Sequence, residues 1–154
     1  MVALAAQPMM KLENFDLDAP FGSVTLVGIG HHWDLHAWAD FVGAEFMPEH
    51  DRLVLEWRAP DGQENPWGSP GNDSSGCRLV FNGVSFFQIS PRDPAYPSSE
   101  SRTVASISKA SLSETKFRFQ NSWDAGEPFR LLVEFQDERR IEVEAESVSL
   151  ERLP

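Results

Sequence analysis

Near the end of the chain, apolar and polar side chains alternate on both sides of a short polar turn at residues 136–139. The apolar members of this pattern are Phe129, Leu131, Val133 and Phe135 before the turn, and Ile141, Val143 and Ala145 after it. A period of two residues places them on one face of an extended chain, whereas a helix would scatter them around its axis. The pattern therefore predicts an antiparallel hairpin with one buried and one solvent-facing side. Its parity changes at Val148 and Leu150, which predicts a β-bulge or a new strand near residues 146–147.

Shorter patterns of the same kind recur along the rest of the chain. Alternation over residues 52–59 predicts a strand, paired as a hairpin with a strand that starts near residue 39 after a short helical turn. Asn82 and Gly83 separate two apolar runs and favour a type I′ turn, which predicts a hairpin of residues 77–81 with 84–89. Further strands are expected at residues 24–29 and 116–120, with an edge strand at 102–108.

The number of short strands and the lack of a long helical pattern indicate the fold class. We expect a mainly β protein, an antiparallel β-sandwich or flattened barrel of about 8–10 short strands with at most one short helix. Residues 1–10 lack the early positive charge and continuous apolar run of a secretion signal, and we expect them to form a flexible tail. Residues 11–154 are expected to form a single β domain.

The charge balance is strongly acidic, with 24 Asp and Glu against 13 Lys and Arg and a net charge of −11. The electric field of such a charge repels nucleic-acid phosphates and anionic membranes. If the charge serves binding, it favours a basic protein as partner. Solubility is the simpler explanation of the charge. No segment approaches the roughly 18 apolar residues of a membrane span. The lone Cys77 cannot form an intramolecular disulfide, so we expect a cytoplasmic protein.

One candidate binding surface is a row of carboxylates on the solvent face of the last hairpin. Alternation makes Glu142, Glu144 and Glu146 project together, where they could contact a basic protein or a calcium ion. Arginines in the same hairpin, Arg130 among them, offer the alternative that the row is paired across the strands.

A second candidate consists of aromatic side chains in irregular segments. Trp67 lies in the loop at residues 60–76, Tyr96 in the Pro-rich connection at residues 90–99, and Trp123 in a loop before the last hairpin. Loop aromatics can anchor a protein or stack on a sugar, or they can fold back onto the rim of the core. The sequence leaves both alternatives open.

The histidine-rich segment at residues 31–36 offers a metal site as an alternative. On a strand, His32, Asp34 and His36 would share a face, and two imidazoles with one carboxylate are plausible metal ligands. Surface or hydrogen-bonded histidines explain the same residues. No nucleophile motif or glycine-rich phosphate loop is present. We therefore expect a protein without a cofactor, and a non-enzymatic one.

Four segments taken in order carry a family resemblance: residues 33–36 (WDLH), 53–57 (LVLEW), 78–87 (RLVFNGVSFF) and 141–148 (IEVEAESV). This order resembles small uncharacterised bacterial β domains, some of which are similar to immunity proteins of polymorphic toxin systems. The resemblance spans residues 33–150 and implies a non-catalytic protein binder, which agrees with the acidic charge if the target toxin is basic. No functional residue is carried over from it.

The leading hypothesis is thus a β domain that binds a basic protein through an acidic face and loop aromatics. The alternative is a small-molecule or carbohydrate-binding β module, or a metal-dependent enzyme that uses His32, Asp34 and His36. A homo-oligomer joined through sheet edges is a third possibility, and the sequence leaves the oligomeric state open.

Overall fold

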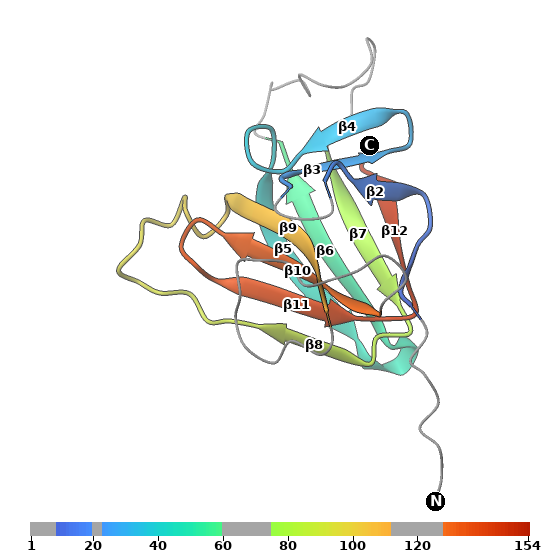
Figure 1. Ribbon diagram of the computed structural model, residues 1–154. Helices are drawn as coiled ribbons and strands as arrows, with labels where there is room; N and C mark the ends of the chain where they lie inside the picture. Colours follow the sequence, from blue (N-terminus) through green and yellow to red (C-terminus); the bar gives the residue numbers. More distant parts are fainter. Residues whose placement is uncertain (1–8, 20–22, 60–74, 112–127) are drawn as a thin grey trace, which may run out of the picture.

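The computed structural model describes residues 9–19, 23–59, 75–111 and 128–154 (Figure 1). These residues are mainly strand and form three sheets, none of which closes into a barrel. The prediction of a sandwich-like β fold is confirmed. The expected strand at residues 116–120, and the loops that hold Trp67 and Trp123, lie outside the described residues.

The largest sheet has five strands and brings together both ends of the described chain. Its order is β1 (Lys11–Leu12), β12 (Ser147–Arg152), β7 (Gly76–Asn82), β6 (Arg52–Arg58) and β5 (Asp40–Met47). All neighbours are antiparallel except β1 and β12, which pair in parallel. The predicted hairpin of residues 39–59 is confirmed as β5 and β6, joined by the short 3-10 helix η1 (Pro48–His50).

The second sheet has four strands and lies across the first in Figure 1. Its order is β8 (Phe86–Ile89), β11 (Arg140–Glu144), β10 (Phe129–Phe135) and β9 (Val104–Ser111). The predicted terminal hairpin is confirmed as β10 and β11, and the expected edge strand is β9. A third sheet of β2 (Phe15–Leu17), β3 (Thr25–Gly28) and β4 (His31–Asp34) lies at one end.

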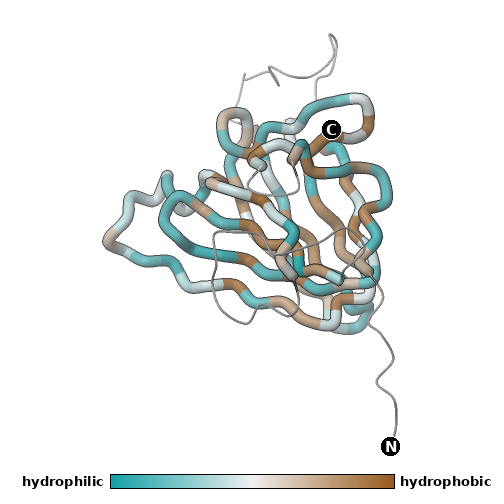
Figure 2. The backbone as a smooth tube through the Cα atoms, viewed as in Figure 1, coloured by the Kyte–Doolittle hydropathy of each residue, from teal (hydrophilic) through white to brown (hydrophobic). Residues whose placement is uncertain are grey.

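The core lies between the two larger sheets and is continuous with the inner side of the third. Leu53, Leu55 and Trp57 alternate along β6 and are completely buried. Figure 2 shows the corresponding alternation of apolar and polar residues along the strands. Phe41 of β5 joins the sheets, because its ring centroid lies 5.3 Å from that of Trp57 and 5.1 Å from that of Phe135. None of the helices in the described ranges is long and apolar enough to cross a bilayer.

The prediction of a hairpin around Asn82 and Gly83 is wrong. The turn exists, with Gly83 at a φ of 65°, but β7 pairs with β12 and β6, whereas β8 pairs with β11 in the other sheet. The backbone N–H of Glu146 donates to the carbonyls of both Asn82 and Gly83, which holds this crossing between the sheets. A local turn signal specifies a reversal of the chain, but the partner of each strand depends on which apolar face it must bury.

Residues 31–36 also differ from expectation, because β4 was not predicted. Residues 29–30 join β3 and β4 as a hairpin, with φ of 47° at Ile29 and 78° at Gly30. The buried Trp33 explains the strand: its side chain is inaccessible, and its indole Nε1–H donates to the Gly28 carbonyl at 2.9 Å. The change of parity near residues 146–147 is confirmed as a new strand, since β11 ends at Glu144 and β12 starts at Ser147 in the other sheet.

Ile29 provides a test of this hairpin. A β-branched residue at positive φ is strained, and asparagine followed by glycine is favoured in this kind of turn. We expect Ile29→Asn to raise the free energy of unfolding by about 1 kcal/mol, measured by urea denaturation. Little burial is lost, because Ile29 is 42% exposed. The control Val42→Asn, at an exposed residue without positive φ, should give no gain; a loss of stability in Ile29→Asn would contradict the turn geometry.

Candidate functional site

The predicted carboxylate row lies on the outward face of the four-stranded sheet, and two of its three members are paired. Arg130 of β10 donates from Nε to Glu144 Oε1 at 2.6 Å and from Nη1 to Glu142 Oε2 at 2.9 Å. The guanidinium also lies 4.4 Å from the ring centroid of Phe86. Burial alone would lower the pKa of Arg130, but hydrogen bonds and charges from Glu144 and Glu142 outweigh it and raise the pKa. With Arg140 Nη1 3.8 Å from Glu142 Oε1, two arginines offset the charges of Glu142 and Glu144 on this face.

Glu146 does not continue the row, because β11 ends at Glu144. It is exposed in the connection to β12, where its side chain occupies the space above Gly83. The alternation in the sequence predicted that the three carboxylates project together from one strand. In the structure the chain passes from β11 to β12 of the other sheet, and Glu146 lies in the connection between them. A binding role for Glu142, Glu144 and Glu146 stays a prediction, with Glu146 outside the strand that holds the other two.

Glu134 occupies the same face of β10, directly across from Arg140 of β11. Burial raises the pKa of Glu134 above its ordinary value of 4.5, and the charge of Arg140 opposes this rise. A raised carboxyl pKa means that the folded state binds the proton more tightly than the unfolded state. Stability contributed by this group is therefore lost as the pH rises from 4.5 through the folded pKa.

The Glu134→Gln variant tests this linkage. At pH 7 the amide removes the cost of burying a charge, so we expect a higher melting temperature than that of the native chain. Below pH 4.5, where the native carboxyl is protonated in both states, the difference should disappear. Thermal melts followed by circular dichroism at both pH values measure it, and an equal gain at both would show that charge is not the cause.

The second candidate, Tyr96, lies in the connection between β8 and β9, which is hydrogen-bonded internally. The N–H of Tyr96 donates to the Asp93 carbonyl at 3.2 Å, and its own carbonyl accepts from Arg92 Nη2 at 2.9 Å. Asp93 Oδ1 in turn accepts the N–H of Ala95 at 2.9 Å. These bonds give the segment around Tyr96 a defined turn conformation.

A buried polar cluster fastens this loop to the turn between β10 and β11. Ser101 and Asp137 are only 5% and 3% exposed, and Ser101 Oγ donates to Asp137 Oδ2 at 2.7 Å. Arg92 Nε donates to the same Ser101 oxygen at 3.0 Å, and Arg139 Nη2 donates to the Ser101 carbonyl at 2.6 Å. The Arg139 guanidinium packs 4.8 Å from the ring centroid of Phe135. Buried polar groups with several partners position a loop firmly.

Several carboxylates of this anchored loop and of the neighbouring turn act electrostatically on the Tyr96 side chain. The pKa of Tyr96 is raised, first by the charge of Glu138, then by slight desolvation, and further by the charges of Asp93, Glu100 and Asp137. All four carboxylates come from the loop itself or from the turn it is fastened to, and Asp137 is the buried one. A partly exposed phenol with acidic neighbours suits a Lys or Arg side chain, which can pack on the ring while its charge faces the carboxylates. We call Tyr96, Asp93, Glu100 and Glu138 the Tyr96 surface.

Of the three aromatic residues predicted to bind, Tyr96 alone lies within the described residues. Trp67 and Trp123 fall outside them. The residues that hold Tyr96 in place were not identified from the sequence. Ser101 and Asp137 lie in polar, turn-forming segments where solvent exposure is the ordinary expectation, and only their contact across 36 residues of chain makes them a buried pair.

The alternative metal site at residues 32–36 is not supported by the geometry. Within the described ranges, no three His, Cys, Asp or Glu residues are grouped so that they could hold a metal ion. Asp34 Oδ1 instead accepts the N–H groups of His36 and Ala37 at 2.8 and 2.7 Å, which caps the turn after β4. His36 Nδ1 lies 2.8 Å from the Val104 carbonyl, which can only accept, so this nitrogen carries the proton. His32 is exposed on β4.

Cys77 is completely buried at the start of β7, opposite Trp57. Burial raises the pKa of its thiol well above the usual range, which leaves almost no thiolate at neutral pH. The residue therefore acts as a small apolar side chain of the core.

Comparisons of the chain with protein-family models, with curated proteins and with solved structures found no match.

Substitution of Asp137 tests whether the buried cluster fastens the Tyr96 loop. Asp137→Ala leaves the hydroxyl of Ser101 without its acceptor, and we expect it to lower the free energy of unfolding by about 1–3 kcal/mol. Hydrogen exchange of amides at residues 92–101 should also accelerate. The matched control is Gln136→Ala, an exposed neighbour on the same turn, which should change stability by less than about 0.5 kcal/mol. Unchanged exchange in Asp137→Ala would refute the anchoring role.

Proposed function

We propose that this chain is a non-enzymatic protein-binding domain whose partner is basic, and that the Tyr96 surface makes the central contact. The observation that carries the proposal is a partly exposed tyrosine on an anchored loop, with carboxylates on the same loop and on the turn to which the loop is fastened. Tyrosine is enriched among the residues that dominate binding energies, because it brings a large contact area with little rotamer entropy.

The anchoring of the Tyr96 loop favours a binding role for this loop over that of a connection that only faces solvent. A loop that is already ordered loses little conformational entropy when a partner docks, so more of the contact energy appears as affinity. The two arginines near Tyr96, Arg92 and Arg139, use guanidinium nitrogens for bonds to Ser101 and to the loop backbone. The carboxylates Asp93 and Glu138 are exposed. Their exposure favours a cationic partner.

The negative net charge of the chain agrees with a basic partner. A net charge of −11 attracts a basic protein during encounter and repels phosphate backbones. The resemblance to immunity proteins of polymorphic toxin systems is consistent with the same function, in which an acidic inhibitor would cover a basic toxin domain in the bacterial cytoplasm. A basic toxin domain encoded beside this chain is the first partner to test.

The test uses Tyr96→Ala with Tyr96→Phe as its matched control. With a purified partner obtained by affinity capture, we expect Tyr96→Ala to weaken binding about tenfold, or about 1.4 kcal/mol, because the ring contact is lost. Tyr96→Phe keeps the ring and should bind within about threefold of the native chain. Calorimetry at constant salt measures both.

Kinetics supply the second arm of this test. The association rate should fall steeply as salt is added, and Glu138→Lys should reduce both the rate and its dependence on salt. An association rate indifferent to ionic strength, together with native affinity in Tyr96→Ala, would contradict the proposed function.

A further inference from the structure

The strand β5 forms an edge of the five-stranded sheet, and no other described strand pairs with its outer side. Within the part of the chain that the structure describes, its backbone has one partner outside β6, the bond from the Phe41 N–H to the Arg102 carbonyl at 2.9 Å. Natural edge strands are usually short or carry Lys or Pro, which discourages further pairing. The eight residues of β5 include neither. The strand is protected by a bulge between Phe41 and Gly43 and by the charges of Asp40 and Glu45, which repel acidic segments and not basic ones.

A shallow depression of about 210 Å³ lies on the solvent face beside this edge. Its lining residues are Val42, Gly43, Ala44, Glu45, Val54 and Glu56. Val42 is 51% exposed, and a Cβ placed on Gly43 would meet no atom within 4 Å. Gly43 pairs directly with Glu56 of β6. A side chain arriving from beyond the edge can therefore pass over Gly43 without obstruction.

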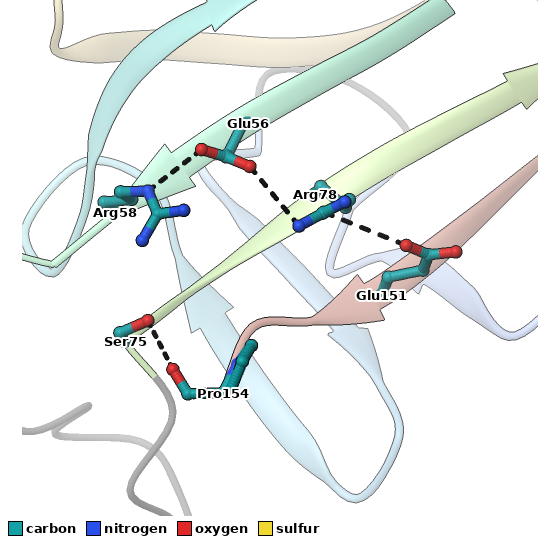
Figure 3. Close-up of polar contacts among 6 residues, drawn as sticks. All are labelled: Glu56, Arg58, Ser75, Arg78, Glu151 and Pro154. Atoms are coloured by element: carbon teal, nitrogen blue, oxygen red, sulfur yellow. Dashed lines mark hydrogen bonds and ion pairs between the residues drawn. The ribbon is translucent and has the colours of Figure 1, made fainter. Parts of the chain in front are cut away.

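The two carboxylates that line the depression, Glu45 and Glu56, differ in whether they form ion pairs with arginines. Figure 3 shows Glu56 shared between Arg58, at 2.9 Å, and Arg78, at 3.5 Å, with Arg78 continuing to Glu151 at 3.8 Å. Glu45 is exposed and forms no ion pair with any other described residue. An unpaired carboxylate beside apolar Val42 and Val54 suits a long cationic side chain, whose stem is apolar and whose head is charged.

We propose that an extended segment of the basic partner adds to the sheet alongside β5 and places a Lys or Arg side chain over Gly43. Backbone hydrogen bonds along the open edge would supply affinity, and the contact with Glu45 would select the cationic side chain. Self-pairing of β5 in a second copy is disfavoured, because the strand carries Asp40 and Glu45 and no cation. The inference deepens the proposed function and rests on it for the basic character of the partner.

The two contacts can belong to one interface. The bond from Phe41 to Arg102 ties one end of β5 to the loop that carries Tyr96. A partner whose segment runs along β5 toward Phe41 would therefore meet the Tyr96 loop at the end of the strand.

A defined peptide tests the strand addition without a natural partner. The probe is an acetylated and amidated Thr-Val-Thr-Lys-Thr-Val-Thr peptide, titrated into the full ¹⁵N-labelled chain. We expect amide shift changes concentrated at residues 42–47 and 54–56. Glu45→Lys should weaken binding about tenfold through charge reversal. The matched control Glu49→Lys, an exposed carboxylate just beyond β5 with the same change in net charge, should stay within about twofold of the native chain.

A second probe requires no variant of the protein. The same peptide N-methylated at alternate residues cannot donate backbone hydrogen bonds along one edge, and it should produce no shifts at β5. Shifts confined to the Tyr96 loop, equal effects of Glu45→Lys and Glu49→Lys, or no shifts at millimolar peptide would each overturn strand addition. The proposed function would still be judged by the Tyr96 variants and the purified partner.

Discussion

Burial of apolar side chains between two sheets is the constraint on which the rest of this structure depends. Phe41, Trp57 and Phe135 meet from β5, β6 and β10, so one aromatic contact joins the two larger sheets. Because each strand must turn its apolar face toward this layer, the chain changes sheets wherever its pattern would otherwise face solvent. Both crossings, at Gly83 and at Ala145, connect strands of opposite sheets.

The sheet architecture also decides which charges remain available. On the four-stranded sheet, Arg130 is held between Glu142 and Glu144, and Arg140 also pairs with Glu142, so two arginines offset the charges of two glutamates. On the five-stranded sheet, Glu56 and Arg78 belong to a similar network. Uncompensated carboxylates instead lie at the rim, around Tyr96 and along the open edge of β5. Of these carboxylates, Asp93, Glu138 and Glu45 are exposed.

This distribution connects the two proposals. The anchored loop and the edge of β5 are the two binding elements that we propose, one contributing an aromatic ring and the other backbone groups that no described strand pairs. The hydrogen bond between Phe41 and Arg102 makes them neighbours. Both have acidic side chains close by, so one basic partner could use them together.

The sequence by itself determined the class of fold and several pairings, because alternation with a period of two residues is a local property. The hairpins β5–β6 and β10–β11 follow from their own residues and short turns. Strand β4 was missed because histidines and one tryptophan give no clear alternation. Among the candidate site residues, Tyr96 was predicted, but its acidic neighbours and anchoring cluster were not.

Only the tertiary structure decided which sheet each strand joins and which polar groups are buried. Asn82 and Gly83 predict a reversal, yet the flanking strands do not pair with each other: β7 pairs with β6 and β12, and β8 pairs with β11. Ser101 and Asp137 become a buried pair only when two distant turns meet. The physical reason is the same in both cases: local preferences set the conformation of a few residues, whereas pairing and burial depend on contacts between segments far apart in the chain.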